Sequence, residues 1–305
     1  MTQATEHKAA GWATRPERSS LPVLRLMVWL SLHLGRRASR VVLYAIAAYF
    51  VVFAPAAKRA SKAYLRRALG RPARLPDGFR HVLSFASTIH DRVYWLRGRF
   101  ELFEVGISGE EHITALRRAG RGIVFMGGHF GSFEALRVLG ERQGIEPKML
   151  MFPDNARMVG AALAAINPAL VDSVIALGRP DSVLRVRDHL AAGGSVGILA
   201  DRELGGDKTR RVPFLGEPAA FPLGPFRLAA MLGAPVVFMA GAYLGGHRYH
   251  LHFAPVADFA ELSANQRPEV ILQAQDRFVA LLEERCKAAP WNWFNFYDFW
   301  HAPPS

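Results

Sequence analysis

The sequence predicts an α/β fold with a mostly parallel central sheet covered by helices on both faces, preceded by an N-terminal membrane-associated helical segment. Two observations support this prediction. From residue 122 onward, short and continuously apolar runs alternate with helical patterns, as in sheets buried on both sides. Before residue 71, two apolar segments are bordered by clusters of Arg and Lys.

Composition narrows the possible classes of protein. The chain has 305 residues, enough for one large domain or two small ones, and half of them are hydrophobic, which excludes a disordered chain. The net charge of +12 suggests an acidic partner: an anionic membrane, an acidic carrier protein or nucleic acid. The single cysteine, Cys286, excludes an internal disulfide framework and any Cys-x-x-Cys metal site.

The N-terminal third divides into two parts. Residues 1–20 form a polar tail that does not begin like a signal peptide. In residues 21–70, Leu26–Leu34 is short, and Val41–Ala57 is uncharged and near the lower limit of about 17 residues for crossing a bilayer. Because basic clusters flank both segments, we expect two membrane-anchoring helices that dip into one leaflet. A single span and a pair of buried soluble helices are the alternatives.

Residues 71–305 are predicted to form the catalytic domain. A Pro-, Gly- and Arg-rich stretch over residues 71–82 predicts a linker into it. His81–Phe103 follows as an amphipathic helix, in which His90 and Asp91 are expected to serve packing or surface contacts.

In the rest of this domain, predicted strands alternate with predicted helices. Predicted strands are Ile123–Met126, Met149–Phe152, Val174–Leu177, Val196–Ala200, Val236–Ala242 and Tyr249–Phe253. Predicted helices are Ser132–Arg142, Ala156–Ala165, Asp181–Ala192, Gly224–Leu232 and Pro268–Ala288.

The most informative stretch runs from Gly122 to Glu134. Its apolar run ends in two glycines, His129 follows at once, and a glutamate precedes a helical pattern. A strand, a tight turn and a helix would place His129 at the carboxyl end of a parallel sheet, where such folds hold their sites. A histidine can accept a proton near neutral pH, and Glu134 would orient its ring. The alternative is a turn histidine that caps the helix.

A second polar group follows another predicted strand. Asp201, Arg202 and Glu203 come directly after Val196–Ala200, so they are expected to line the same cleft as His129. Downstream, the segment from Arg211 to Pro225 could form one wall of an apolar groove. A loop salt bridge beside an ordinary turn is the alternative.

Two further patterns carry less functional weight. His250 and His252 would share one face of a strand, but no third ligand with suitable spacing follows, so no metal site is predicted. No P-loop or Gly-x-Gly-x-x-Gly motif supports a nucleotide cofactor. The aromatic tail, residues 290–300, is expected to clamp the core, with a membrane-interface role as the alternative.

The order of these motifs resembles that of the bacterial lipid A biosynthesis acyltransferases, the lauroyl and myristoyl transferases of the lysophospholipid acyltransferase superfamily. The resemblance rests on Gly128-His129-x4-Glu134, Ala200-Asp-Arg-Glu203, Val212–Gly216 and the Gly-Pro-x-Arg-Leu-Ala run from Gly224. Residues 201–203 stand where the family usually shows an Asp-Gln-Asp run.

The resemblance implies an inner-membrane enzyme that faces the cytoplasm. It would transfer a fatty acyl group from acyl carrier protein to a hydroxyl of a lipid or glycolipid, without a metal or other cofactor and without nucleic acid. His129 would be the base, Glu134 its partner, and Gly128, Asp201, Arg202, Glu203 and Arg211 would bind substrate. A membrane-associated hydrolase and a non-catalytic lipid-binding protein are the alternatives.

Overall fold

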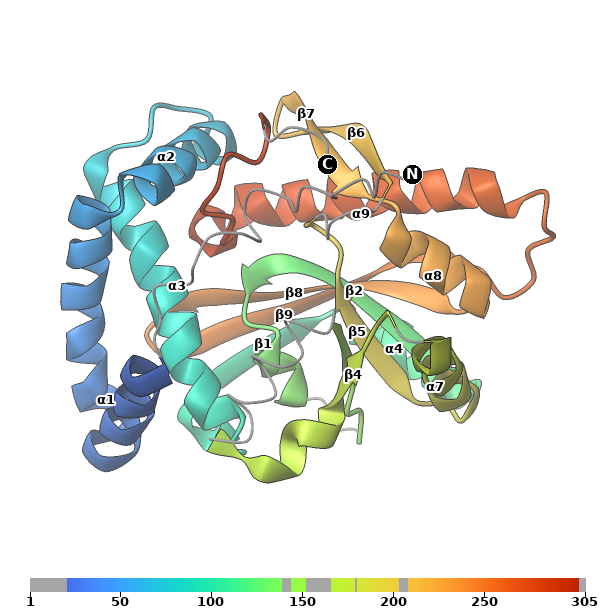
Figure 1. Ribbon diagram of the computed structural model, residues 1–305, viewed down its shortest axis with the longest axis horizontal. Helices are drawn as coiled ribbons and strands as arrows, with labels where there is room; N and C mark the ends of the chain where they lie inside the picture. Colours follow the sequence, from blue (N-terminus) through green and yellow to red (C-terminus); the bar gives the residue numbers. More distant parts are fainter. Residues whose placement is uncertain (1–20, 139–143, 152–165, 179, 203–207, 302–305) are drawn as a thin grey trace, which may run out of the picture.

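The computed structural model describes residues 21–138, 144–151, 166–178, 180–202 and 208–301 (Figure 1). Its centre is a seven-stranded sheet in the order β1-β9-β8-β2-β5-β3-β4. All neighbouring strands run parallel except β8 and β9, which form an antiparallel pair. The mostly parallel central sheet predicted from the sequence is therefore confirmed.

The predicted strands all appear, but β2, β8 and β9 extend beyond their predicted ends, and β2 includes His129, so the tight turn predicted before this residue is wrong. They are β2 (Ile123–Gly131), β3 (Lys148–Met151), β4 (Val174–Ala176), β5 (Ser195–Leu199), β8 (Pro235–Gly245) and β9 (Arg248–Asp258). The strand β1 (Glu104–Ser108) was not predicted, because this half-exposed edge strand lacks an apolar run. The hairpin of β6 (Thr209–Phe214) and β7 (Glu217–Pro222) was also missed, since its prolines and arginines conceal the strand pattern.

The helices of the second half agree closely with the prediction. They are α7 (Pro180–Ala191), α8 (Gly224–Leu232) and α9 (Arg267–Ala288), while α4 (Glu110–Arg118) is an addition. The helix expected at 156–165 lies outside the described residues. The one expected at 132–142 is described only as far as residue 138, and it opens with the short 3-10 turn η2 (Glu134–Leu136).

Alternating residues of the central strands face two different cores. Val124 and Met126 of β2 belong to a cluster that includes residues of α8 and α9, whereas Ile123 and Phe125 belong to a cluster with residues of α4 and η2. Because side chains of a strand alternate between its faces, helices must cover both faces of the sheet, and Figure 1 shows them on either side. This burial explains the continuous apolar runs in the sequence.

The helix α3 (Leu75–Trp95) begins earlier than predicted and ends earlier. The carboxylate of Asp77 accepts the backbone N–H of Arg74 at 2.8 Å and pairs with Arg71 at 2.8 Å, which caps the first turn. Pro76 lies in that first turn, where its missing N–H costs nothing. The predicted linker over residues 71–82 therefore shrinks to the few residues before Leu75.

The N-terminal segment consists of α1 (Leu21–Phe53), interrupted at Gly35, and α2 (Pro55–Leu69). Large apolar side chains along α1 are more than half exposed: Trp29, Leu34, Val41, Tyr44, Tyr49, Val52 and Phe53. Within the described residues, no single helix is long and apolar enough to cross a bilayer. The pair His33–Phe53 and Pro55–Leu69, bent by 96°, meets that test by length and composition alone. Membrane attachment stays a prediction.

The buried face of α2 joins the main core. Tyr64, Leu65 and Ala68 pack in the same cluster as the sheet and α9. Arg67 also pairs with Glu217 of β7 at 2.5 Å. The division of the chain at residue 71 stays a prediction, but α2 and the following domain share one core.

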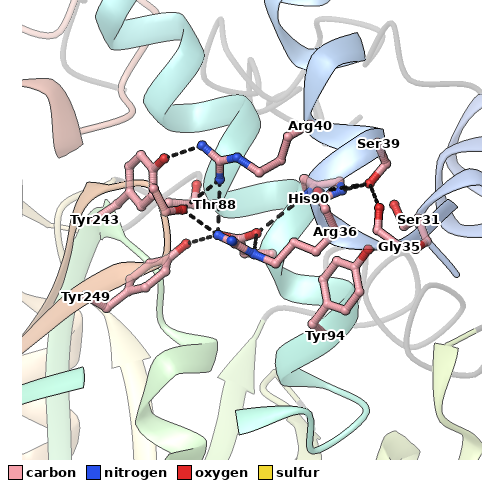
Figure 2. Close-up of polar contacts among 12 residues, drawn as sticks. Ser31, Gly35, Arg36, Ser39, Arg40, Thr88, His90, Tyr94, Tyr243 and Tyr249 are labelled. Atoms are coloured by element: carbon pink, nitrogen blue, oxygen red, sulfur yellow. Dashed lines mark hydrogen bonds and ion pairs between the residues drawn. The ribbon is translucent and has the colours of Figure 1, made fainter. Parts of the chain in front are cut away.

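A buried polar network holds α1 against the rest of the molecule (Figure 2). The carboxylate of Asp91, on α3, is fully buried and accepts two hydrogen bonds from Arg36, at 2.8 and 2.7 Å. It also accepts the hydroxyl of Tyr249 at 2.8 Å. Arg40 lies 3.8 Å from the same carboxylate and donates to the hydroxyl of Tyr243 at 2.6 Å. The network thus ties α1 to α3 and to the β8–β9 pair.

His90 extends this network toward α1. Its Nε2 lies 2.7 Å from the hydroxyl of Ser39, and its Nδ1 lies 3.3 Å from Asp91. Burial alone would raise the pKa of Asp91, but the hydrogen bonds from His90 and Arg36 hold it below its ordinary value. Of the two roles expected for His90 and Asp91, packing or surface contacts, the structure shows contacts inside the protein, and these contacts are polar.

The substitution Asp91→Ala should destabilise the protein strongly. It leaves the nearly buried guanidinium of Arg36 without its carboxylate, and losing one partner of a buried pair costs about 3–5 kcal/mol. Urea unfolding of both variants measures the loss. The control Asp188→Ala removes an exposed carboxylate on α7 and should change stability by less than about 0.5 kcal/mol. Equal effects of the two substitutions would contradict a stabilising role for the network.

Candidate active site

His129 lies near the carboxyl end of the central strand β2. The strand continues past the two glycines to Gly131, and its register against β8 shifts between Gly127 and Gly131. A Cβ atom on Gly128 would lie 3.1 Å from Oδ2 of Asp201 and 3.1 Å from Cδ1 of Leu282. Glycine at this position therefore allows the backbone before His129 to approach the carboxylate.

Asp201 reaches His129 from the neighbouring strand. It follows β5, which pairs with β2 in parallel and places Leu199 opposite Gly127. Oδ1 of Asp201 lies 2.7 Å from Nδ1 of His129, and Oδ2 accepts the backbone N–H of His129 at 2.9 Å. The sequence-based expectation that the loops after these two strands meet at one edge of the sheet is confirmed.

The aromatic tail completes the surroundings of Asp201. The indole N–H of Trp293 donates to Oδ2 at 2.9 Å, and Nδ2 of Asn295 donates to the same oxygen at 2.9 Å. Trp293, Asn295 and Asp201 are each at most 1% exposed. The tail thus clamps the core, as expected, and also supplies two donors that the sequence analysis did not name.

These contacts fix the state of the imidazole. A carboxylate only accepts hydrogen bonds, so Nδ1 of His129 carries the proton toward Asp201 and Nε2 is left as the proton acceptor. Burial lowers the pKa of His129, and the nearby charge of Arg202 lowers it further. The side chain nevertheless remains 28% exposed. His129 is therefore a neutral base near pH 7 that solutes can reach.

The charge of Asp201 is strongly favoured. Burial would raise the pKa of this carboxyl, but its interactions with His129 and with Arg202 hold it well below the ordinary value. A carboxylate that stays ionised keeps the ring of His129 in one orientation and stabilises the imidazolium when it forms.

Glu134 is engaged elsewhere. Its Oε1 lies 2.6 Å from Nε of Arg92, which is on α3, and Ser132 donates to its Oε2 at 3.4 Å. Because β2 continues past His129 and the chain turns only at Gly131, where φ is +60°, Glu134 is not carried back onto the imidazole as it would be by a tight turn before His129. The structure therefore gives the ring a different carboxylate from the one expected, while Glu134 binds a cation near the site.

Arg202 joins the site to the tail. Its Nε donates to Oδ1 of Asn295 at 2.6 Å, and one terminal nitrogen donates to the carbonyl of Phe294 at 3.0 Å. The guanidinium also lies 5.8 Å from the ring centre of Tyr297. Arg202 thus supports the segment that holds Asp201, in addition to acting on the pKa of His129.

The other candidate residues are less central. Glu203 lies outside the described residues. Arg211, on β6, donates to the carbonyl of Trp300 at 2.9 Å, so it holds the end of the tail. His250 and His252 share one face of β9, as predicted, and both contact the hydroxyl of Ser108. The described part of the chain contains no group of three or more side chains suited to hold a metal ion.

Comparison with known proteins identifies the family of the chain. The sequence model of a family described as bacterial lipid A biosynthesis acyltransferase matches residues 86–302, which include β2, the loop after β5 and the tail. No curated protein matches the chain. Because the family match covers most of the sequence and every element of the His129 site, the chain belongs to the bacterial lipid A biosynthesis acyltransferase family.

Proposed function

We propose that this protein is a membrane-bound O-acyltransferase that moves a fatty acyl group from acyl carrier protein to a hydroxyl of a lipid or glycolipid. It would work at the cytoplasmic face of the bacterial inner membrane, on a lipid A precursor or a related bacterial lipid. The observation that carries this proposal is the His129–Asp201 pair, which presents an accessible basic nitrogen at the end of two central strands.

The proposed reaction needs no nucleophile from the enzyme. The acceptor hydroxyl gives its proton to Nε2 of His129 as its oxygen attacks the carbonyl carbon of the acyl thioester. The tetrahedral intermediate then collapses, forming the ester and breaking the carbon–sulfur bond. The departing thiolate takes the proton from the imidazolium, so the carrier leaves as a thiol and His129 returns to its neutral state.

The intermediate carries a negative charge that the site has to stabilise. Backbone N–H groups around Gly127, Gly128 and Gly131 are candidate donors, and positive charge is close by. The positive charges of Arg202 and Arg92 both lower the pKa of His129, and we propose that the same charges stabilise the intermediate. Glu134 would then hold Arg92 in place.

The N-terminal helices support a membrane surface as the place of action. The exposed apolar side chains of α1 are followed directly in the chain by exposed cations on α2. These cations are Lys58, Arg59, Lys62 and Arg66. Apolar side chains beside clustered cations suit the acyl boundary and the anionic headgroups of one leaflet. The same positive charge would attract an acidic carrier protein.

Purified full-length protein, radiolabelled acyl carrier protein substrate and a total lipid extract test the proposed reaction directly. The proposal expects a labelled lipid whose mass has increased by one acyl group. Release of free fatty acid alone would identify a hydrolase, and no turnover would favour a non-catalytic lipid-binding protein. Either result would overturn the proposal.

Substitutions of His129, Asp201 and Glu134 should show which of the two carboxylates orients the imidazole. We expect His129→Ala to reduce kcat by ~10² to 10⁴, the usual contribution of a general base. Asp201→Asn should lose activity on the same scale, because an amide facing Nδ1 favours the wrong tautomer. Glu134→Gln should lose less. The control His301→Ala changes a histidine that is 70% exposed and should be silent. A larger loss in Glu134→Gln than in Asp201→Asn would return the orienting role to Glu134.

The pH dependence should follow the pKa of His129. Because burial and Arg202 lower this pKa below 6.5, kcat/KM should fall on the acid side only below pH 6.5. Arg202→Gln removes a positive charge, so the acid limb should move to higher pH. Arg202→Lys keeps the charge and should leave the limb near its original position, although kcat falls because the planar contacts to the tail are lost. An unmoved acid limb in Arg202→Gln would contradict this assignment.

The exposed apolar side of α1 should determine membrane binding. The double substitution of Val41 and Val52 by Asp should strongly reduce co-sedimentation of the protein with vesicles that contain anionic lipid, because it places charge on the surface expected to enter the leaflet. Leu184→Asp on α7 introduces the same side chain at an apolar residue that is 51% exposed and serves as control. Unchanged sedimentation of the double variant would refute the anchor.

A further inference from the structure

The carboxylate of Asp201 receives four hydrogen bonds although it is fully buried. Oδ1 faces Nδ1 of His129, and Oδ2 accepts the backbone N–H of His129, the indole N–H of Trp293 and Nδ2 of Asn295. A buried carboxylate needs such donors to stay ionised. Two of the four come from the C-terminal tail, far away in the sequence.

Trp293 is held so that its N–H can point in only one direction. Its ring packs against Tyr64, Phe214 and Phe299, with ring centres 5.0, 5.2 and 4.7 Å away, and it is fully buried. Its carbonyl lies 2.8 Å from Nε2 of His81. A donor fixed in this way adds no reorientation cost when the charge on the neighbouring pair changes.

The tail also lies directly alongside β2, the strand that carries His129. Phe130 and Trp293 form an antiparallel bridge, and the N–H of Phe294 donates to the carbonyl of His129 at 2.7 Å. The same short segment therefore contacts the backbone of His129 and the side chain of its partner, Asp201.

Asn295 acts as a hydrogen-bond donor on one side and as an acceptor on the other. Its Nδ2 donates to Asp201, while its Oδ1 accepts Nε of Arg202 at 2.6 Å. An aspartate at this position could accept from Arg202 but could not donate to Asp201. The amide of Asn295 thus donates to the carboxylate of Asp201 and accepts from the guanidinium of Arg202, and no charged side chain can do both.

We propose that Trp293 and Asn295 are positioning residues that orient Asp201 and set the basicity of His129. Their N–H groups draw negative charge toward Oδ2, which leaves Oδ1 a weaker acceptor for Nδ1 of His129. Losing one donor concentrates charge on Oδ1, raises the pKa of the imidazole and allows the carboxylate to rotate. The inference rests on the proposed function, in which His129 is the base.

The substitution Trp293→Phe tests this role, since it keeps an aromatic ring and removes the N–H. Because Trp293 is fully buried, the smaller ring also leaves a cavity and is expected to lower the melting temperature, so the pKa of His129 and kcat are compared on folded protein. Trp291→Phe is its matched control in the same tail, because the indole nitrogen of Trp291 is buried and has no hydrogen-bond partner. Asn295→Asp provides a second variant that retains the size of the side chain.

Two quantities are measured on each folded full-length variant. The first is the pKa of His129, from the pH titration of its ring signals by NMR with ¹³C-labelled histidine, assigned through His129→Asn. The second is kcat and KM for acyl transfer. We expect Trp293→Phe to raise the pKa by about half a unit, to lower kcat roughly tenfold and to leave KM for the acyl carrier substrate nearly unchanged. Asn295→Asp should show a larger loss of kcat, and Trp291→Phe should match the original protein.

A variant Trp293→Phe that melts earlier, yet keeps the original pKa of His129 and the original kcat when folded, would overturn the inference and leave the tail with a purely structural role. The proposed function fails in a different way. If the unsubstituted protein transfers no acyl group while the pKa of His129 still rises in Trp293→Phe, the tail positions the pair but the pair serves another reaction.

Discussion

The hydrogen bond between the buried carboxylate of Asp201 and the imidazole of His129 is the interaction on which the rest of the site depends. A fully buried carboxylate is costly unless every lone pair finds a donor, and here the donors come from β2 and the tail. This requirement brings three distant parts of the chain to one point. It also explains why glycine precedes His129, since a Cβ on Gly128 would press against the carboxylate.

The helix α3 connects this site to the N-terminal segment. At one end His81 bonds both Ser61 of α2 and the carbonyl of Trp293, and burial lowers its pKa to about 4, so it stays neutral. Near the other end, Asp91 binds α1 through Arg36, and the next residue, Arg92, pairs with Glu134. The segment expected to meet the membrane is thus joined to the site through one rigid element.

Much of the fold could be predicted because its strands are buried on both faces and read as apolar runs. The strands β2 and β5 and the helices α8 and α9 follow from such patterns, and so does the meeting of His129 with Asp201 at one sheet edge. The edge strand β1 and the β6–β7 hairpin could not be predicted, since neither carries an uninterrupted apolar pattern.

The partner of His129 shows where local spacing misleads. Glu134 was expected to orient the ring because it lies five residues away in the sequence, but β2 continues past His129 and the imidazole bonds Asp201 after the neighbouring strand. Trp293 and Asn295 depend on the return path of the tail, which no local pattern encodes. The asparagines within the aromatic tail were the one available signal, because a buried amide needs polar partners.

The most direct test of this account is the tautomer of His129 in the unsubstituted protein. Nitrogen-15 NMR of the ring at a pH above its titration reports which nitrogen carries the proton. The account predicts a proton on Nδ1, directed at Asp201, and an unprotonated Nε2. A proton on Nε2 would contradict it, because His129 would then have no basic nitrogen facing the substrate and Asp201 would not be its hydrogen-bond acceptor.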